Sequence, residues 1–213
     1  MNYKDNCRFC SNLRLNDNKE FNLPKEETIL FENENFYVKV DISPLCIGHI
    51  LIITNDHYLN FFEVPNRIKQ DIIKIKQKII SIYKETYNDD VLFFEHGSAI
   101  EGEAGSSIDH AHLHCIPYKF SINNEVNKLL KNSVECDIFL NEFNNEFSYI
   151  YLESIKDGKK LYKVNKLPSQ FLRKIIANSF NNKEYKWQTE CQKKESINKL
   201  NKTIEDLKNK ISI

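Results

Sequence analysis

The order of apolar and polar residues along the first half of the chain predicts strands, then one long helix, then strands again. Residues 27–32, 35–41 and 49–54 are short apolar or alternating runs, separated by Asn, Pro and Gly residues that favour turns. From Pro65 to Tyr87 isoleucines recur every three or four positions (68, 72, 75, 79 and 82), which is the period of an amphipathic helix with proline near its first turn.

The pattern then returns to strands. Residues 91–95 and 109–116 predict two more strands, joined by a Gly- and Ser-containing loop at 97–107. Together these elements predict an α+β fold, in which an antiparallel sheet of about five strands carries the central helix packed across it.

Beyond residue 119 the patterns predict a mixed, partly helical segment. The expected elements are helices at 123–131 and 168–179, a hairpin of 148–153 and 160–164 that turns at Asp157-Gly158, and a last helix after Trp187. The apolar stripe of that last helix (197, 200, 204, 207 and 211) is typical of a helix docked on a surface. We therefore expect a first domain at 1–119 and a C-terminal extension at 120–213.

Charge and composition narrow the class of partner. Thirty Lys and Arg residues balance thirty Asp and Glu residues, so no overall field attracts nucleic acid or an anionic membrane. No apolar run reaches the roughly 18 residues of a membrane span, and the first residues lack the apolar core of a secretion signal. We expect a cytoplasmic protein that uses neither membranes nor nucleic acid, with its six cysteines as thiols or ligands.

Three histidines alternate with apolar residues in the strand at 109–116. His110, His112 and His114 share one face of that strand, while the residues between them share the other. Neighbouring histidines are about 7 Å apart and the outer pair about 13 Å, so one metal ion would hardly bind all three. Imidazole ligates metals, titrates and attacks phosphorus near neutral pH, so the alternation predicts a functional site on this face.

A second candidate feature is the pair Cys7 and Cys10, which has the two-residue spacing of a zinc knuckle. A closed tetrahedral zinc site needs two more ligands, and because no second Cys-x-x-Cys follows, histidines would have to supply them. A redox pair is less favoured because no strand precedes it in a βαβ unit. Two unrelated buried thiols remain the alternative.

The stretch 104–117, AGSSIDHAHLHCIP, resembles the His-φ-His-φ-His-φ-φ signature of the histidine triad (HIT) superfamily, where φ is an apolar residue. Upstream, the Cys-x-x-Cys pair and the strand that ends in Asp41 agree with that family in order and spacing. The resemblance covers residues 5–119 and implies a HIT-like catalytic domain with a nucleotide as substrate. Members of the family often form homodimers, so a homodimer is an expectation too.

The resemblance also implies individual roles. A structural Zn²⁺ would be held by Cys7, Cys10, His57 and His110. Phosphate oxygens would be held by His114 and by the loop residues Gly105, Ser106 and Ser107.

The catalytic roles are implied in the same way. His112 would attack the α-phosphorus and form a nucleotidyl-histidine. Asp41 would bind ribose hydroxyls, although an Asp before Ser-Pro is also an ordinary turn residue. His96 could contact the leaving group, assist its protonation or cap its strand. His49 is more typical of a hydrogen-bonded structural histidine.

The function that this reading implies is a nucleotide hydrolase that cleaves a nucleoside phosphoanhydride, with dinucleoside polyphosphates as the favoured substrates. One alternative is a nucleotidyltransferase or phosphorylase that passes the nucleotidyl group to phosphate or a sugar phosphate. Another is a non-catalytic, zinc-stabilised nucleotide-binding module, which Ser106 favours because many members of the family carry Gln at that position.

Overall fold

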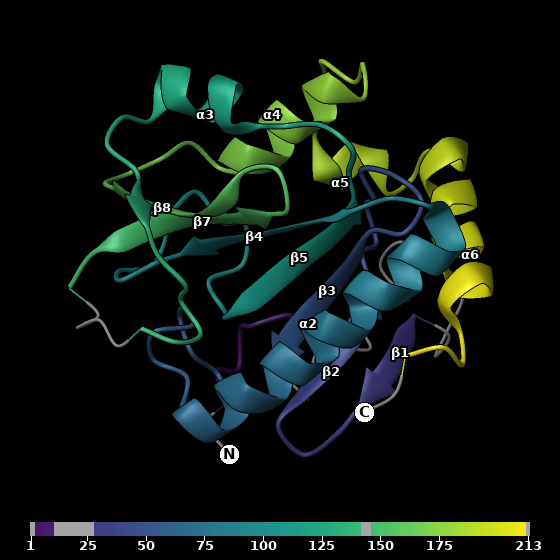
Figure 1. The fold of residues 1–213 in the computed structure, drawn as a ribbon, viewed down its shortest axis with the longest axis horizontal. Coiled ribbons are helices and arrows are strands. Elements are labelled where there is room, and N and C mark those ends of the chain that lie inside the picture. The colour runs from purple at the N-terminus through teal and green to yellow at the C-terminus, as the bar shows by residue number, and fades with distance from the viewer. Residues whose placement is uncertain (1–2, 11–27, 142–145, 212–213) are drawn as a thin grey trace.

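In the computed structural model, which describes residues 3–10, 28–141 and 146–211, the chain forms an antiparallel sheet with helices on both faces (Figure 1). The strands are β1 (Ile29–Glu32), β2 (Phe36–Val40), β3 (Ile50–Thr54), β4 (Val91–Gly97), β5 (His112–Pro117), β6 (Val134–Glu135), β7 (Ser148–Ser154) and β8 (Gly158–Val164). The helices are α2 (Asn66–Tyr87), α3 (Asn123–Leu129), α4 (Phe171–Ser179), α5 (Trp187–Glu190) and α6 (Lys194–Leu207).

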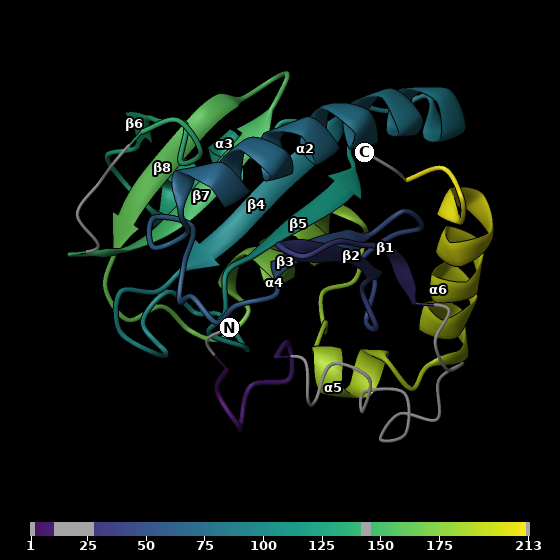
Figure 2. The same ribbon diagram turned by 90° about the horizontal axis from the view of Figure 1, so that it is seen from below.

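The central helix predicted from the isoleucine spacing is confirmed as α2. Its five stripe isoleucines are buried against β2, β3, β4 and β5, together with Val38, Ile52 and Leu113. Pro65 precedes the first helical residue, and Asn88 ends the helix in the left-handed conformation that Asn tolerates. Figure 2 shows α2 on one side of the sheet and α4 and α5 on the other. None of the described helices is long and apolar enough to cross a membrane.

The α+β class and the antiparallel sheet are confirmed, but the expected number of strands was wrong. The described residues form eight strands in the order β1-β2-β3-β5-β4-β7-β8-β6. The hairpin predicted at 148–164 is β7 and β8, and β7 pairs with β4 from Phe93↔Glu153 to Gly97↔Tyr149. Strands β6, β7 and β8 therefore extend the same sheet, because the open edge of β4 offers backbone groups that need partners.

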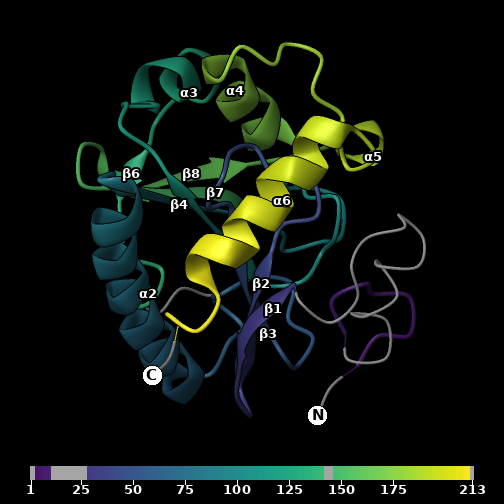
Figure 3. The same ribbon diagram turned by 90° about the vertical axis from the view of Figure 1, so that its right-hand side faces the viewer.

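The second face of the sheet is covered by two separate groups of residues. Helices α3 and α4 pack on the half that holds β4, β7 and β8, and the N-terminal residues Cys7 to Cys10 pack on β2 and β3. Helix α6 lies against the edge near β1 and β2, as Figure 3 shows, and its stripe residues Leu200, Ile204 and Leu207 are buried. The β5 histidines lie on this second face, between the two groups.

Glu95 makes the stability of this sheet depend on pH. Burial raises its pKa to about 8, although Tyr149 and the Phe61 amide donate hydrogen bonds to the carboxyl. Because the folded-state pKa lies above the unfolded value, its contribution is complete below about pH 4.5 and is lost as the pH rises through 8. Histidines are largely neutral in both states above pH 7. We expect unfolding free energy to fall between pH 7 and 8 by up to about 1.4 kcal/mol.

Urea denaturation at several pH values measures this dependence. Glu95→Gln should remove most of the slope between pH 7 and 8. If Glu95→Gln kept the wild-type pH dependence of the unfolding free energy, a group other than Glu95 would be responsible for it.

Candidate functional site

The four residues predicted as metal ligands converge in the structure. The atoms Cys7 Sγ, Cys10 Sγ, His57 Nδ1 and His110 Nδ1 all lie within 4.8 Å of one another. Tetrahedral zinc would separate its sulfur and nitrogen ligands by about 3.6 Å and its two nitrogens by about 3.3 Å. The sulfur–nitrogen distances here are 3.3, 3.6 and 3.9 Å, and the two nitrogens are 3.2 Å apart. The donor set could therefore hold a tetrahedral metal ion.

The surroundings orient these ligands toward the same point. His110 donates its Nε2–H to the carbonyl oxygen of Thr54 at 2.8 Å, which leaves the Nδ1 lone pair for a metal. Burial raises the pKa of the Cys7 thiol to about 11, and a bound cation would favour the thiolate instead. Since the two cysteines precede β1 and the histidines flank β3 and β5, a metal here would tie the N-terminal residues to the sheet.

His112 is held with one nitrogen available. Its Nδ1–H donates to the carbonyl oxygen of His110 at 2.5 Å, so the lone pair is on Nε2. Burial lowers the pKa of His112, which keeps the imidazole neutral at physiological pH. The predicted alternation is confirmed, because Leu113 and Cys115 are buried in the core that contains α2.

A short chain of hydrogen bonds fixes the tautomer of His114. The Leu45 amide donates to Nδ1 of His49, so neutral His49 carries its proton on Nε2. That Nε2–H donates to Nδ1 of His114 at 3.0 Å, so the proton of His114 is on its own Nε2. His49 is thus a buried, hydrogen-bonded histidine, and His114 carries an N–H donor where His112 carries a lone pair.

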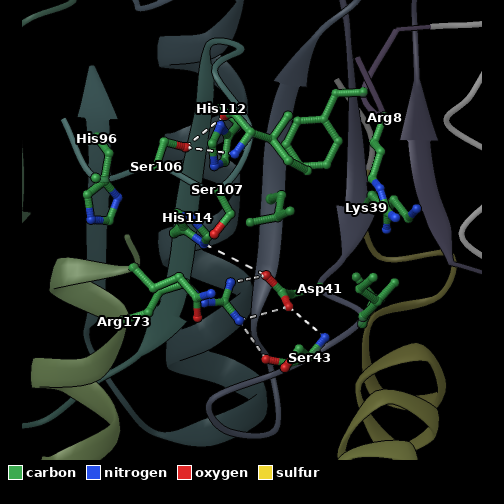
Figure 4. Close-up of a pocket in the computed structure, with 17 residues that line it drawn as sticks. Arg8, Lys39, Asp41, Ser43, His96, Ser106, Ser107, His112, His114 and Arg173 are labelled. Carbon is green, nitrogen blue, oxygen red and sulfur yellow. Dashed lines mark hydrogen bonds and ion pairs between the residues drawn. The ribbon is translucent and has the colours of Figure 1, made fainter. Parts of the chain in front are cut away.

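The residues predicted for catalysis and substrate binding line a single pocket (Figure 4). They are Asp41, His96, Gly105, Ser106, Ser107, His112 and His114. One part of the wall is apolar and comes from Phe9, Ile42 and Leu51. Neutral imidazoles, hydroxyls and backbone groups beside an apolar wall are suited to a phosphorylated compound with a flat ring.

Comparison with known proteins agrees with this geometry. Residues 22–121 match the family model described as "HIT domain". The chain contains a HIT domain. An uncharacterized HIT-like protein of Methanocaldococcus jannaschii is 29% identical over 116 residues, which span 54% of this chain and 86% of that protein. A Saccharomyces cerevisiae bis(5'-adenosyl)-triphosphatase is 32% identical over 101 residues, 46% of this chain and 47% of that enzyme.

Solved structures include a HIT family protein from Bacillus anthracis, which is 27% identical to this chain. The match covers 56% of this chain and 77% of that protein, with a TM-score of 0.43. The residues matched by the family model end at 121, so the pocket walls built from later residues lie outside the matched segment.

Four pocket residues come from outside the matched segment: Arg8 and Phe9 precede it, and Gln170 and Arg173 follow it. Nη1 of Arg173 donates to Asp41 Oδ2 at 2.6 Å and Nη2 donates to Oδ1 at 3.2 Å. Tyr185 and Ser43 accept further hydrogen bonds from the guanidinium. Sequence reasoning missed Arg173, because an arginine in a weakly patterned helix carries no local signal of its pairing with a residue 132 positions away.

This pairing constrains the role implied for Asp41. Burial alone would raise the pKa of Asp41, but Arg173 and His49 outweigh it and hold the pKa below its usual value. The Ser43 amide also donates to Oδ1, so three of about four lone-pair directions of the carboxylate are already used. The binding of both ribose hydroxyls by Asp41 stays a prediction, and it would require Arg173 to shift.

The predicted phosphate loop of the HIT domain is held by the segment that leads into α4. The Gln170 amide donates to the Gly105 carbonyl oxygen at 2.6 Å, and the Leu167 amide donates to Glu103. Gly105 has φ +74°, and a Cβ there would lie 2.6 Å from the carbonyl oxygen of Pro168, so only glycine allows this approach. The Ser106 hydroxyl donates to the Ile108 carbonyl oxygen within the loop.

His96 is in contact with the same helix. The Leu172 amide, in the first turn of α4, donates to His96 Nε2 at 3.2 Å. Burial lowers the pKa of His96 to about 3, so its ring is neutral. One nitrogen of His96 therefore anchors α4, and only Nδ1 remains for a catalytic role.

We expect Arg173→Ala to lower the free energy of unfolding by about 3–5 kcal/mol, because it leaves the buried carboxylate of Asp41 without a counter-charge. Urea denaturation measures the change. The double variant Asp41→Asn with Arg173→Met removes both charges and should recover most of the loss. If Arg173→Ala alone were as stable as the wild type, the ion pair would not hold α4 in place.

Proposed function

We propose that this HIT-domain protein is a nucleotide hydrolase that cleaves a nucleoside phosphoanhydride at the α-phosphate. A nucleotidyl-histidine on His112 is the intermediate, and dinucleoside polyphosphates are the favoured substrates. The observation that carries the proposal is the pairing of a free Nε2 lone pair on His112 with an Nε2–H on His114, in one pocket. The likeness to a bis(5'-adenosyl)-triphosphatase supports the substrate class.

The chemistry follows from these tautomers. The lone pair of His112 Nε2 attacks the α-phosphorus, and the bond from phosphorus to the bridging oxygen breaks, so the leaving phosphate departs with the electron pair. The Nδ1–H of His112 keeps its hydrogen bond to the His110 carbonyl oxygen, and this bond stabilises the positive charge that develops on the ring. The His114 N–H and the loop residues 105–107 stabilise charge on the phosphoryl oxygens.

Water completes the reaction. Its oxygen bonds to phosphorus, the bond from phosphorus to Nε2 breaks, and the electron pair returns to His112 while a water proton passes to the solvent. The product is a nucleoside monophosphate, and His112 is again neutral with its lone pair on Nε2.

Zn²⁺ is proposed as the resident metal of the Cys7, Cys10, His57 and His110 cluster. Two thiolates and two imidazoles are a donor set that zinc prefers, and all four positions are supplied by protein. Such a site has no open position for substrate, so zinc would stabilise the fold at His110 and, through β5, the position of His112.

Trapping the intermediate tests the proposed function. Protein mixed with a dinucleoside polyphosphate labelled in the α-phosphate, then denatured without acid, should carry label on the peptide that contains His112. Turnover without any labelled peptide would contradict the mechanism. Adding inorganic phosphate as a competing acceptor distinguishes a hydrolase from a phosphorylase, because a phosphorylase would yield nucleoside diphosphate instead of monophosphate.

A further inference from the structure

His96 presents a hydrogen-bond donor to the pocket. Because Nε2 accepts the Leu172 amide, the neutral ring carries its proton on Nδ1. The side chain is 4% exposed, and within the described residues Nδ1 has no acceptor. Figure 4 shows His96 on the side of the pocket formed by β4 and α4. Because His96 lines the pocket and Nδ1–H has no protein acceptor, an acceptor atom of a ligand can pair with it.

Arg173 has a donor left over on the same side. The guanidinium has five N–H groups, which donate to the carboxylate of Asp41, the carbonyl oxygen of Ser43 and the hydroxyl of Tyr185. Nη1 carries two hydrogens and donates only one of them, to Asp41 Oδ2. Arg173 lines the pocket, and its second Nη1 hydrogen has no protein acceptor among the described residues.

Helix α4 begins at the pocket without a side-chain cap. Gln170, the residue before it, adopts the left-handed conformation and lines the pocket. Among the described residues, the amides of Phe171 and Arg173 in the first turn have no acceptor. Uncapped amides at a helix N-terminus carry partial positive charge and favour an anion.

The two ends of the pocket differ in chemistry. The apolar wall comes from Phe9 of the N-terminal residues, Ile42 after β2 and Leu51 of β3. Arg8 and Lys39, which lie opposite His96 in Figure 4, line the pocket as well. In Figure 4, His96 lies on the left of the pocket and Arg8 and Lys39 lie on its right, with His112 and His114 between them. A substrate that extends past His112 in the direction away from Arg8 and Lys39 would bring its leaving group to His96 and α4.

We propose that His96, Arg173 and the N-terminus of α4 form a subsite for the first phosphate of the leaving group. The inference rests on the proposed function and assigns the residues that would recognise its leaving group. The protein would select nucleotides whose leaving group begins with a phosphate over esters and amides of a nucleoside monophosphate. The C-terminal segment would thus determine which bond is cleaved.

Calorimetric binding of AMP and of α,β-methylene-ADP, which cannot be cleaved at the bridging carbon, tests the subsite. Wild-type protein should bind α,β-methylene-ADP at least tenfold more tightly, and His96→Phe should bring the ratio near one. His96→Gln offers both an acceptor for Leu172 and a donor, so it should preserve most of the preference. Tyr118→Phe removes a contact to Ser179 at the far end of α4 and should leave the ratio unchanged.

The outcomes separate the two proposals. A wild-type ratio near one would overturn the subsite even if His112 is labelled during turnover, and so would a His96→Phe ratio equal to that of the wild type. A tenfold ratio that His96→Phe abolishes would support the subsite even if no label appears on His112, in which case only the nucleophile assignment fails. If His96→Phe does not fold, His96→Ala replaces it: a ratio near one supports the subsite, and a ratio equal to that of the wild type overturns it.

Discussion

His112→Ala should lower kcat for a dinucleoside polyphosphate by about 10⁴-fold or more, because no other described imidazole in the pocket has a free nitrogen lone pair to replace it. The lone pairs on Nδ1 of His49 and of His114 already accept hydrogen bonds, from the Leu45 amide and from His49 Nε2–H. The lone pair on His96 Nε2 accepts the Leu172 amide. Steady-state release of nucleoside monophosphate measures the loss. Substrate affinity should change by less than about threefold, since the phosphate contacts proposed here belong to other residues.

His112→Gln is the matched control for this prediction. It has a similar size and can still donate to the His110 carbonyl oxygen, but it lacks a nucleophilic lone pair on nitrogen. It should therefore be as inactive as the alanine variant while melting within a few degrees of the wild type. Activity within tenfold of the wild type in either variant would remove His112 from the mechanism.

Loss of the metal cluster should have the second large effect. We expect protein purified without chelators to contain one zinc per chain, and Cys10→Ser to lose it. Structural zinc contributes on the order of 10 kcal/mol in small domains. Even half of that would lower Tm by roughly 10 °C or more in a chain of this size. Elemental analysis and calorimetric melting measure the two quantities.

Cys46→Ser provides the control for the zinc prediction. Cys46 is a free thiol that lies outside the cluster of Cys7, Cys10, His57 and His110. This variant should keep its zinc and melt close to the wild-type temperature. Protein that contains no metal, or a Cys10→Ser variant that melts like the wild type, would contradict a structural zinc site.

The site shows clearly where local sequence was sufficient. Strict alternation on a strand forces His112 and His114 onto one face and Leu113 onto the other, so the face could be predicted without a fold. The spacing of Cys7 and Cys10 indicated half of a metal site. The meeting of that pair with His57 and His110 depends on how the N-terminal residues pack on β2 and β3, which no local pattern encodes.

The sequence by itself determined the strand and helix periods, the central helix α2, the histidine face and the resemblance to a HIT domain, because each is written in residues close together along the chain. Only the tertiary structure decided that residues 148–164 extend the same sheet and that α4 forms a wall of the pocket. Both depend on partners far apart in sequence. The Asp41–Arg173 pair is the clearest example, since a buried charge is destabilising unless an opposite charge lies beside it, and here that charge comes from a distant part of the sequence.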